Sequence, residues 1–104
     1  MQASEFVSNW YQLKGELVAA FTTADGTSET AKKITALNLT PTQFKQVECI
    51  IDNVIRDTMY TLLLGLDGAA SIGNDQRHLT IADESGQPIG NLEDEAWRRF
   101  HGNQ

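Results

Sequence analysis

A long helical pattern from Thr40 to Leu66 constrains the fold more than any other feature of the chain. The start, Thr40-Pro41-Thr42-Gln43, combines an N-cap threonine, a proline at the first helical position and a glutamine that completes a capping box. Apolar residues then recur at helical spacing: Phe44, Val47, Ile51, Val54, Ile55, Met59, Leu62, Leu63 and Leu66. From Thr58 onward the sequence is apolar nearly all round, so we expect this second half to be the central core element. Gly65 or Gly68 ends the helix.

Two shorter helical patterns come first. Residues 4–21 carry an apolar stripe, with Ser4 as the expected N-cap and Gly15 marking either a close approach or a tolerated surface glycine. The stripe consists of Phe6, Trp10, Leu13, Leu17 and Phe21. After a turn at Asp25-Gly26, residues 28–38 read as a second helix that Ser28 caps and Asn38 ends, with Ala31, Ile34 and Leu37 on one side.

The last third of the chain predicts a hairpin and a short helix. Residues 77–83 alternate as a half-buried strand with Leu79 and Ile81 on one face, and residues 88–90 return as an edge strand. Asn91 is the expected cap of a helix over residues 92–100, which Trp97 and Phe100 dock against the body. We therefore expect a single α+β domain over residues 1–104, mostly α: a three-helix N-terminal body, one β-hairpin and a short C-terminal helix.

The whole net charge of −6 falls in one segment. Residues 67–95 contain one base, Arg77, and seven acids: Asp67, Asp75, Asp83, Glu84, Glu93, Asp94 and Glu95. The other 75 residues carry seven acids and seven bases and sum to zero. Residues 93–95 suit the first turn of the last helix, so four acids are left for a partner. Such segregation of charge favours binding to a basic protein and disfavours binding to nucleic acid. The alternative explanation is that the acidic residues only keep the protein soluble.

Catalytic and metal-binding patterns are missing from the sequence. Cys49, His78 and His101 are too few and too far apart for a zinc site, and Asp67, Asp75 and Asp83 do not follow a calcium-loop pattern. No glycine-rich loop follows a strand, and no nucleophile and base stand together, so we expect no cofactor and no enzyme. A further alternative, a small hydrolase, would need the carboxylates of two of these acids to lie close together in the fold.

The single cysteine and the lengths of the apolar runs indicate where in the cell the protein resides. The single cysteine, Cys49, fits a reducing compartment, and its place in the middle of a helix predicts a buried packing thiol. No apolar run reaches the roughly 18 to 20 residues of a membrane span, and the first residues lack the basic start and apolar run of a signal peptide. We expect a cytoplasmic protein that does not bind membranes.

Two segments carry a resemblance to a known family: the apolar helix end Thr58-Met59-Tyr60-Thr61-Leu62-Leu63-Leu64-Gly65-Leu66-Asp67-Gly68 and the acidic stretch His78-Leu79-Thr80-Ile81-Ala82-Asp83-Glu84-Ser85-Gly86. Over residues 40–90 the chain resembles the small acidic immunity proteins of bacterial contact-dependent growth inhibition and related polymorphic toxin systems. The resemblance implies a cytoplasmic protein that binds the toxin domain of its own system, often a nuclease with a basic cleft, and blocks its active site. It has no diagnostic motif and carries over no individual contact residue.

The charge pattern itself suggests which side chains meet such a partner. We expect Asp67, Asp75, Asp83 and Glu84 to contact it, with Arg77 and His78 setting specificity. The alternative function is a small adaptor or regulatory domain that binds a cellular protein through the polar face of the long helix, formed by Lys45, Glu48, Asp52 and Arg56. For that face, a simple solvated stripe is the preferred interpretation.

Overall fold

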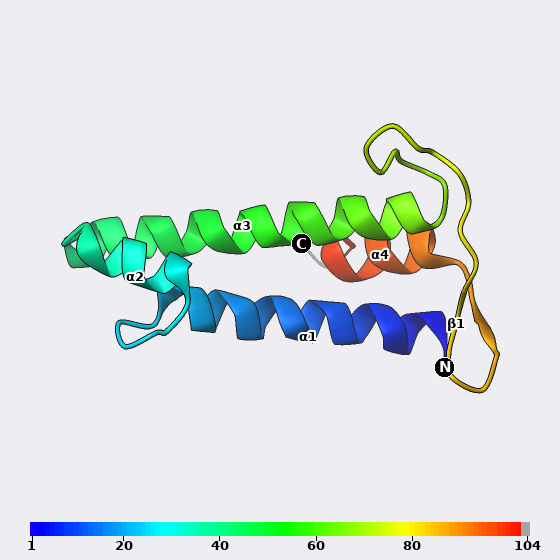
Figure 1. The fold of residues 1–104 in the computed structure, drawn as a ribbon, viewed down its shortest axis with the longest axis horizontal. Helices are drawn as coiled ribbons and strands as arrows, with labels where there is room; N and C mark the ends of the chain where they lie inside the picture. The colour runs from blue at the N-terminus through cyan, green and yellow to red at the C-terminus, as the bar shows by residue number, and fades with distance from the viewer. Residues whose placement is uncertain (103–104) are drawn as a thin grey trace. The chain divides into compact units, whose positions relative to one another are not determined.

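The computed structural model describes residues 1–102, which form four helices and one two-stranded antiparallel sheet (Figure 1). The elements are α1 (Ala3–Thr22), α2 (Glu29–Ala36), α3 (Pro41–Leu66), β1 (Ile81–Ala82), β2 (Pro88–Ile89) and α4 (Leu92–Phe100). Ile81 pairs with Ile89, and Ala82 pairs with Pro88. The predicted α+β fold, mostly helical with a hairpin and a short C-terminal helix, is confirmed. Within the described residues, no helix is both long enough and apolar enough to cross a membrane.

The chain divides into two compact units. The first, here called the loop unit, contains residues 1–11 together with the chain from Arg56 onward. The second, called the helical unit, runs from Gln12 to Ile55. Both α1 and α3 contribute residues to each unit. The prediction of a single domain over residues 1–104 stays a prediction.

The starts of α2 and α3 follow the capping rules. The Thr40 amide donates to Gln43 Oε1 at 3.0 Å and the Gln43 amide donates to Thr40 Oγ1 at 3.2 Å, which confirms the capping box. Ser28 Oγ accepts from the Ala31 amide at 3.0 Å and caps α2. Asn38 follows the end of α2 with a φ of 52°, a left-handed conformation that asparagine tolerates.

Gly68 ends α3, in agreement with one of the two predicted positions. The Ala69 amide donates to the Leu64 carbonyl at 2.9 Å and the Gly68 amide donates to the Gly65 carbonyl at 3.2 Å, the bonding pattern of a Schellman motif. Gly68 has a φ of 79°, and a Cβ on it would lie 3.1 Å from the backbone of His78. A side chain is therefore excluded here by both conformation and space.

The core of the loop unit is built from α1, α3, β2 and α4. Its buried apolar residues are Val7, Met59, Leu63, Ile89, Leu92, Ala96 and Phe100. Because Leu92, Ala96 and Phe100 recur every four residues, they form the buried face of α4. Phe100 docks as predicted, but the prediction for Trp97 is wrong: one residue beyond Ala96, it lies about 100° round the helix and is 58% exposed.

The helical unit has a much smaller core. Its only buried described residues are Ala31, Lys14 and Thr22. Lys14 Nζ donates to Asp52 Oδ1 at 2.5 Å, which marks where α1 and α3 face each other within this unit. Leu13 and Leu37, which we expected to be covered, are 44% and 63% exposed.

Cys49 contradicts the sequence-based expectation. It is exposed, and its sulfur accepts a hydrogen bond from Asn53 Nδ2 at 3.7 Å. The physical reason is helical phase, because Cys49 is two residues from both Val47 and Ile51 and so lies about 200° round α3 from each of them. It is not a packing residue of the apolar stripe.

Two further expectations from the sequence, the length of the first strand and the start of α1, differ from the structure. The strand over residues 77–83 shrinks to Ile81–Ala82, because the Leu79 amide donates to the Leu66 carbonyl at 3.1 Å instead of joining a ladder. The helix α1 already includes Ser4, which is therefore not its N-cap, since the Phe6 amide donates to the Gln2 carbonyl. Nothing lies within 4 Å of a Cβ built on Gly15, so it is a tolerated surface glycine.

Candidate functional site

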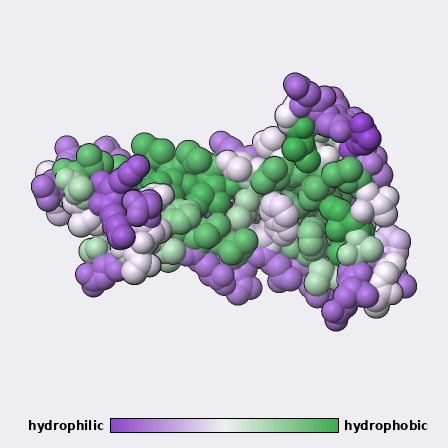
Figure 2. Space-filling model, viewed as in Figure 1, coloured by the Kyte–Doolittle hydropathy of each residue, from purple (hydrophilic) through white to green (hydrophobic). Residues whose placement is uncertain are grey.

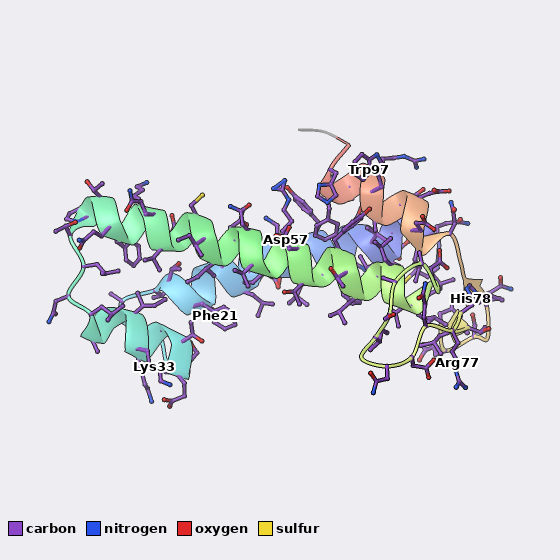
Figure 3. The ribbon with its side chains drawn as sticks, turned by 90° about the horizontal axis from the view of Figure 1, so that it is seen from above. Phe21, Lys33, Asp57, Arg77, His78 and Trp97 are labelled. Atoms are coloured by element: carbon purple, nitrogen blue, oxygen red, sulfur yellow. The ribbon has the colours of Figure 1, made fainter. Side chains whose placement is uncertain are left out.

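All six predicted contact residues belong to the loop unit, and they fall into two groups. Residues 71–80 are exposed at every position and join the end of α3 to the hairpin. Arg77 and His78 project from this loop (Figure 3). We call the side chains of Asp75, Arg77, His78 and Glu84 the loop surface. The carboxylates of Asp67 and Asp83 form the second group, because both bond within the protein.

The loop is held against α3 by the Ile72 side chain, which packs directly over Gly65, and by hydrogen bonds. Ile72 Cγ1 would lie 2.5 Å from a Cβ on Gly65, so only a glycine lets Ile72 pack there. Ile72 and Asp75 then form an isolated antiparallel bridge, with the Ile72 amide donating to the Asp75 carbonyl at 2.7 Å. Gln76 Nε2 adds a bond of 3.3 Å to the Gly68 carbonyl. These contacts fix the loop although its side chains face solvent.

A small hollow lies beneath the loop surface. It has a volume of about 160 Å³ and is lined by Gly65, Ile72, Asp75, Arg77 and Leu79. Arg77 Nε donates to Asp75 Oδ1 at 3.0 Å, and this exposed pair stands beside the apolar side chains of Ile72 and Leu79. An apolar hollow with charged groups at its edge can receive one side chain of a protein partner. Ile72 was not among the residues predicted from the sequence, although it is the one large apolar residue among the small and polar residues 69–76.

His78 and Glu84 complete the loop surface. His78 Nδ1 lies 3.1 Å from the Asp67 carbonyl and 3.7 Å from Asp67 Oδ1, while its side chain remains 64% exposed. Glu84 is exposed in the hairpin turn, and no hydrogen bond or ion pair joins its carboxylate to another described residue. Both side chains therefore have surface available for a partner.

Asp67 has a structural task that the sequence did not reveal. Its Oδ2 accepts from the Glu93 amide at 3.0 Å, at the start of α4. Asn91 occupies the N-cap position but adopts a left-handed conformation and makes no side-chain cap bond, so the prediction that Asn91 caps α4 is wrong. The carboxylate at the end of α3 supplies the missing cap and also faces the positive end of the α4 dipole.

Asp83 organises the hairpin turn. Its Oδ1 accepts from Ser85 Oγ at 2.7 Å and from the amides of Ser85 and Gln87 at 3.0 Å each. Its Oδ2 pairs with the Met1 ammonium at 2.7 Å. The hydrogen bond from that ammonium, followed by the one from Ser85, holds the pKa of Asp83 well below its ordinary value. The same bond raises the pKa of the terminal amine. That Asp67 and Asp83 also touch a partner stays a prediction.

The polar face of α3, the basis of the adaptor alternative, is partly used within the protein. Asp52 pairs with Lys14 in the helical unit, as described above. Arg56 Nε donates to the Phe100 carbonyl at 3.2 Å in the loop unit. Two of the four side chains proposed for adaptor binding therefore already have partners. Among the described residues, no group of three or more His, Cys, Asp or Glu side chains could hold a metal ion.

Comparison with known proteins gives no match. No family model matches the chain, and no match is found among the curated proteins or the solved structures. Functional inference for this chain therefore rests on its own residues.

Proposed function

We propose that the chain is a cytoplasmic immunity protein that binds a toxin domain of its own bacterial system and neutralises it. The toxin domain is a basic nuclease, most simply an RNase, and the loop surface, which belongs to a unit of net charge −5, covers its active site in place of the phosphates of the substrate. The protein acts by binding and has no enzymatic activity of its own. Asp75, Arg77, His78 and Glu84 are the proposed contacts, and Asp67 and Asp83 support them from the fold.

One observation carries the proposal: the negative charge is concentrated in the unit that presents the exposed loop. The loop unit holds nine acids and four bases, a net charge of −5, whereas the helical unit holds five acids and four bases, a net charge of −1; the two sum to −6. Charge of one sign around a binding surface speeds encounter with a partner of the opposite sign. A nuclease cleft must be positive to hold phosphates, so it is such a partner.

The loop surface also offers features that pure charge does not. The hollow over Gly65, Ile72 and Leu79 supports the burial of an apolar or aromatic anchor, which is the usual source of affinity at a protein interface. Arg77 and His78 favour an acidic or polar group on the partner at that point, and so select one toxin among several basic ones.

Co-expression tests the proposal. A candidate nuclease toxin domain, taken from the gene directly upstream where that gene encodes one, is expressed with and without the chain, and survival of the cells and co-purification of the two proteins are measured. We expect protection and a stable complex. Cells that die in the presence of the chain, or a chain and toxin domain that do not co-purify, would overturn the proposal.

A charge-matched pair of variants places the binding surface. Asp75→Lys with Glu84→Lys changes two side chains of the loop surface and is expected to abolish protection. Glu16→Lys with Asp25→Lys makes the same change in net charge on exposed positions of the helical unit and is expected to protect like wild type. Equal loss in both double variants would show that only net charge matters, and would exclude the loop surface as the binding site.

A further inference from the structure

The helical unit leaves an apolar face uncovered. Ala31 is its only fully buried apolar residue among those described, whereas Leu13 and Val54 are 44% and 57% exposed. Leu17, Val47 and Ile51 are only half-buried. Figure 2 shows apolar surface gathered over the α1 and α3 segments of this unit. A unit of 44 residues with so little buried apolar surface is too small to be stable by its own core.

The apolar side chains of α1 and α3 turn to the same side. Lys14 and Asp52 meet between the two helices, which run in opposite directions (Figure 1). Leu13 precedes Lys14 by one residue and Ile51 precedes Asp52 by one residue, so each lies about 100° round its helix from the ion pair. In antiparallel helices this rotation leads to the same flank. Leu13, Leu17, Val47, Ile51 and Val54 therefore form one face, here called the apolar face.

The spacing along α3 indicates what kind of element covers this face. Phe44, Val47, Ile51 and Val54 follow each other at intervals of three, four and three residues, which is the a/d spacing of helices that pack side by side. Leu13 and Leu17 continue the pattern on α1. A helical partner, whose own side chains enter the spaces between these residues, is the element that fits.

We propose that the apolar face binds a second copy of this chain, so that two helical units form a symmetric dimer. Charge favours this occupant, because each helical unit carries a net charge of only −1 while each loop unit carries −5. Self-association through helical units brings little repulsion, whereas association through loop units would oppose two strongly negative surfaces. A two-fold axis places the same patch on both copies, and an apolar patch is complementary to itself. No residue of the loop surface is used.

The size of the face predicts a weak dimer. The 15 residues of α3 in the helical unit, Pro41 to Ile55, span about 22 Å, and two neighbouring helices are about 20 Å wide. The face therefore covers about 440 Å² on each copy, or about 900 Å² in total, which is below the standard interface of about 1,600 Å². An interface of this size belongs to the weak, transient class, so we expect a dimer that forms only at micromolar or higher concentrations of the chain.

Sedimentation equilibrium of the purified full chain tests the proposal. Over a concentration range from about 1 μM to 500 μM, we expect the apparent mass to rise from monomer to dimer. Val54→Asp is expected to keep the chain monomeric throughout, and because Val54 is more than half exposed its helix content should match wild type in circular dichroism. Leu79→Asp, at a position 42% exposed in the loop unit, is the matched control and should dimerise like wild type.

Several results would overturn the proposal. One is a wild-type chain that stays monomeric over the whole range, and another is a Val54→Asp variant that still dimerises. A monomeric wild-type chain that binds phosphatidylcholine vesicles, or whose Val54→Asp variant loses the toxin complex, would assign the face to lipid or to the toxin instead. Toxin binding by the loop surface is measured separately, so either proposal can fail without the other.

Discussion

Asp67→Ala is the most informative single substitution, because it separates a structural acid from the acids of the loop surface. The Asp67 carboxylate is only 15% exposed and accepts from the Glu93 amide at 3.0 Å. Alanine leaves the first turn of α4 without a side-chain cap, since Asn91 does not supply one. The first-turn residues Glu93, Asp94 and Glu95 keep their favourable interaction with the helix dipole but do not replace the lost acceptor.

The expected loss of stability in Asp67→Ala follows from measured N-cap substitutions. Replacing an N-cap acceptor by alanine typically lowers the free energy of unfolding by about 1 kcal/mol, within a range of about 0.5–2 kcal/mol. For a domain of this size that corresponds to a fall in melting temperature of about 4–8 °C per kcal/mol. Asp67→Asn should lose less than Asp67→Ala, because an amide oxygen can still accept the Glu93 hydrogen bond.

Urea unfolding, followed by far-UV circular dichroism and tryptophan fluorescence, measures the effect. Asp75→Ala is the control, since the Asp75 side chain is 56% exposed and its surface ion pair contributes little; a change within about 0.5 kcal/mol is expected. If Asp67→Ala is no more destabilising than Asp75→Ala, then Asp67 is not a cap of α4, and the division of the acids into structural and surface groups is wrong.

Two further predictions concern glycine and pH. Gly68→Ala should lower the free energy of unfolding by about 2 kcal/mol, because alanine resists the left-handed conformation and would contact the His78 backbone. Gly15→Ala, at an open position of a helix, should instead raise the free energy of unfolding by about 0.5–1 kcal/mol. Urea unfolding that gives changes of the same sign for both variants would contradict these two predictions. The ion pair of Asp83 with the Met1 ammonium should make stability depend on pH at both ends. Because the pKa of Asp83 is lowered, its contribution is complete above about pH 4 and is lost as the pH falls through the lowered pKa. Because the pKa of the Met1 amine is raised, its contribution is complete below about pH 8 and is lost as the pH rises through the raised pKa. Acetylation of that amine should remove the alkaline dependence, and an unchanged profile would exclude the ion pair as its source.

The helix ends that depend only on residues close in the sequence could be predicted from the sequence. The capping box at Thr40, the cap at Ser28 and the glycine end at Gly68 each depend on neighbours within five residues, and all three are confirmed. The same is true of the four helices, whose apolar spacing is a local property.

Features that depend on contacts distant in sequence were not predictable. Asp67 caps a helix that begins 25 residues later, so nothing near it in the sequence indicates the task. The phase of α4 was misjudged at Trp97 because burial depends on which neighbour the helix meets. The exposure of Cys49, in contrast, follows from its local phase relative to Val47 and Ile51 and could have been predicted. The candidate site was found from charge alone, and charge cannot distinguish an acid that bonds within the fold from one that is left for a partner.

The rate of association with the toxin domain is the sharpest test of whether the loop surface recognises a basic partner. Stopped-flow fluorescence at low and high salt would compare wild type with Asp75→Lys/Glu84→Lys and with the charge-matched Glu16→Lys/Asp25→Lys. We predict fast, salt-sensitive association for wild type, a fall in the association rate of at least about tenfold at low salt for the loop-surface variant, and little change for the control. Association of the loop-surface variant at the wild-type rate would contradict this prediction.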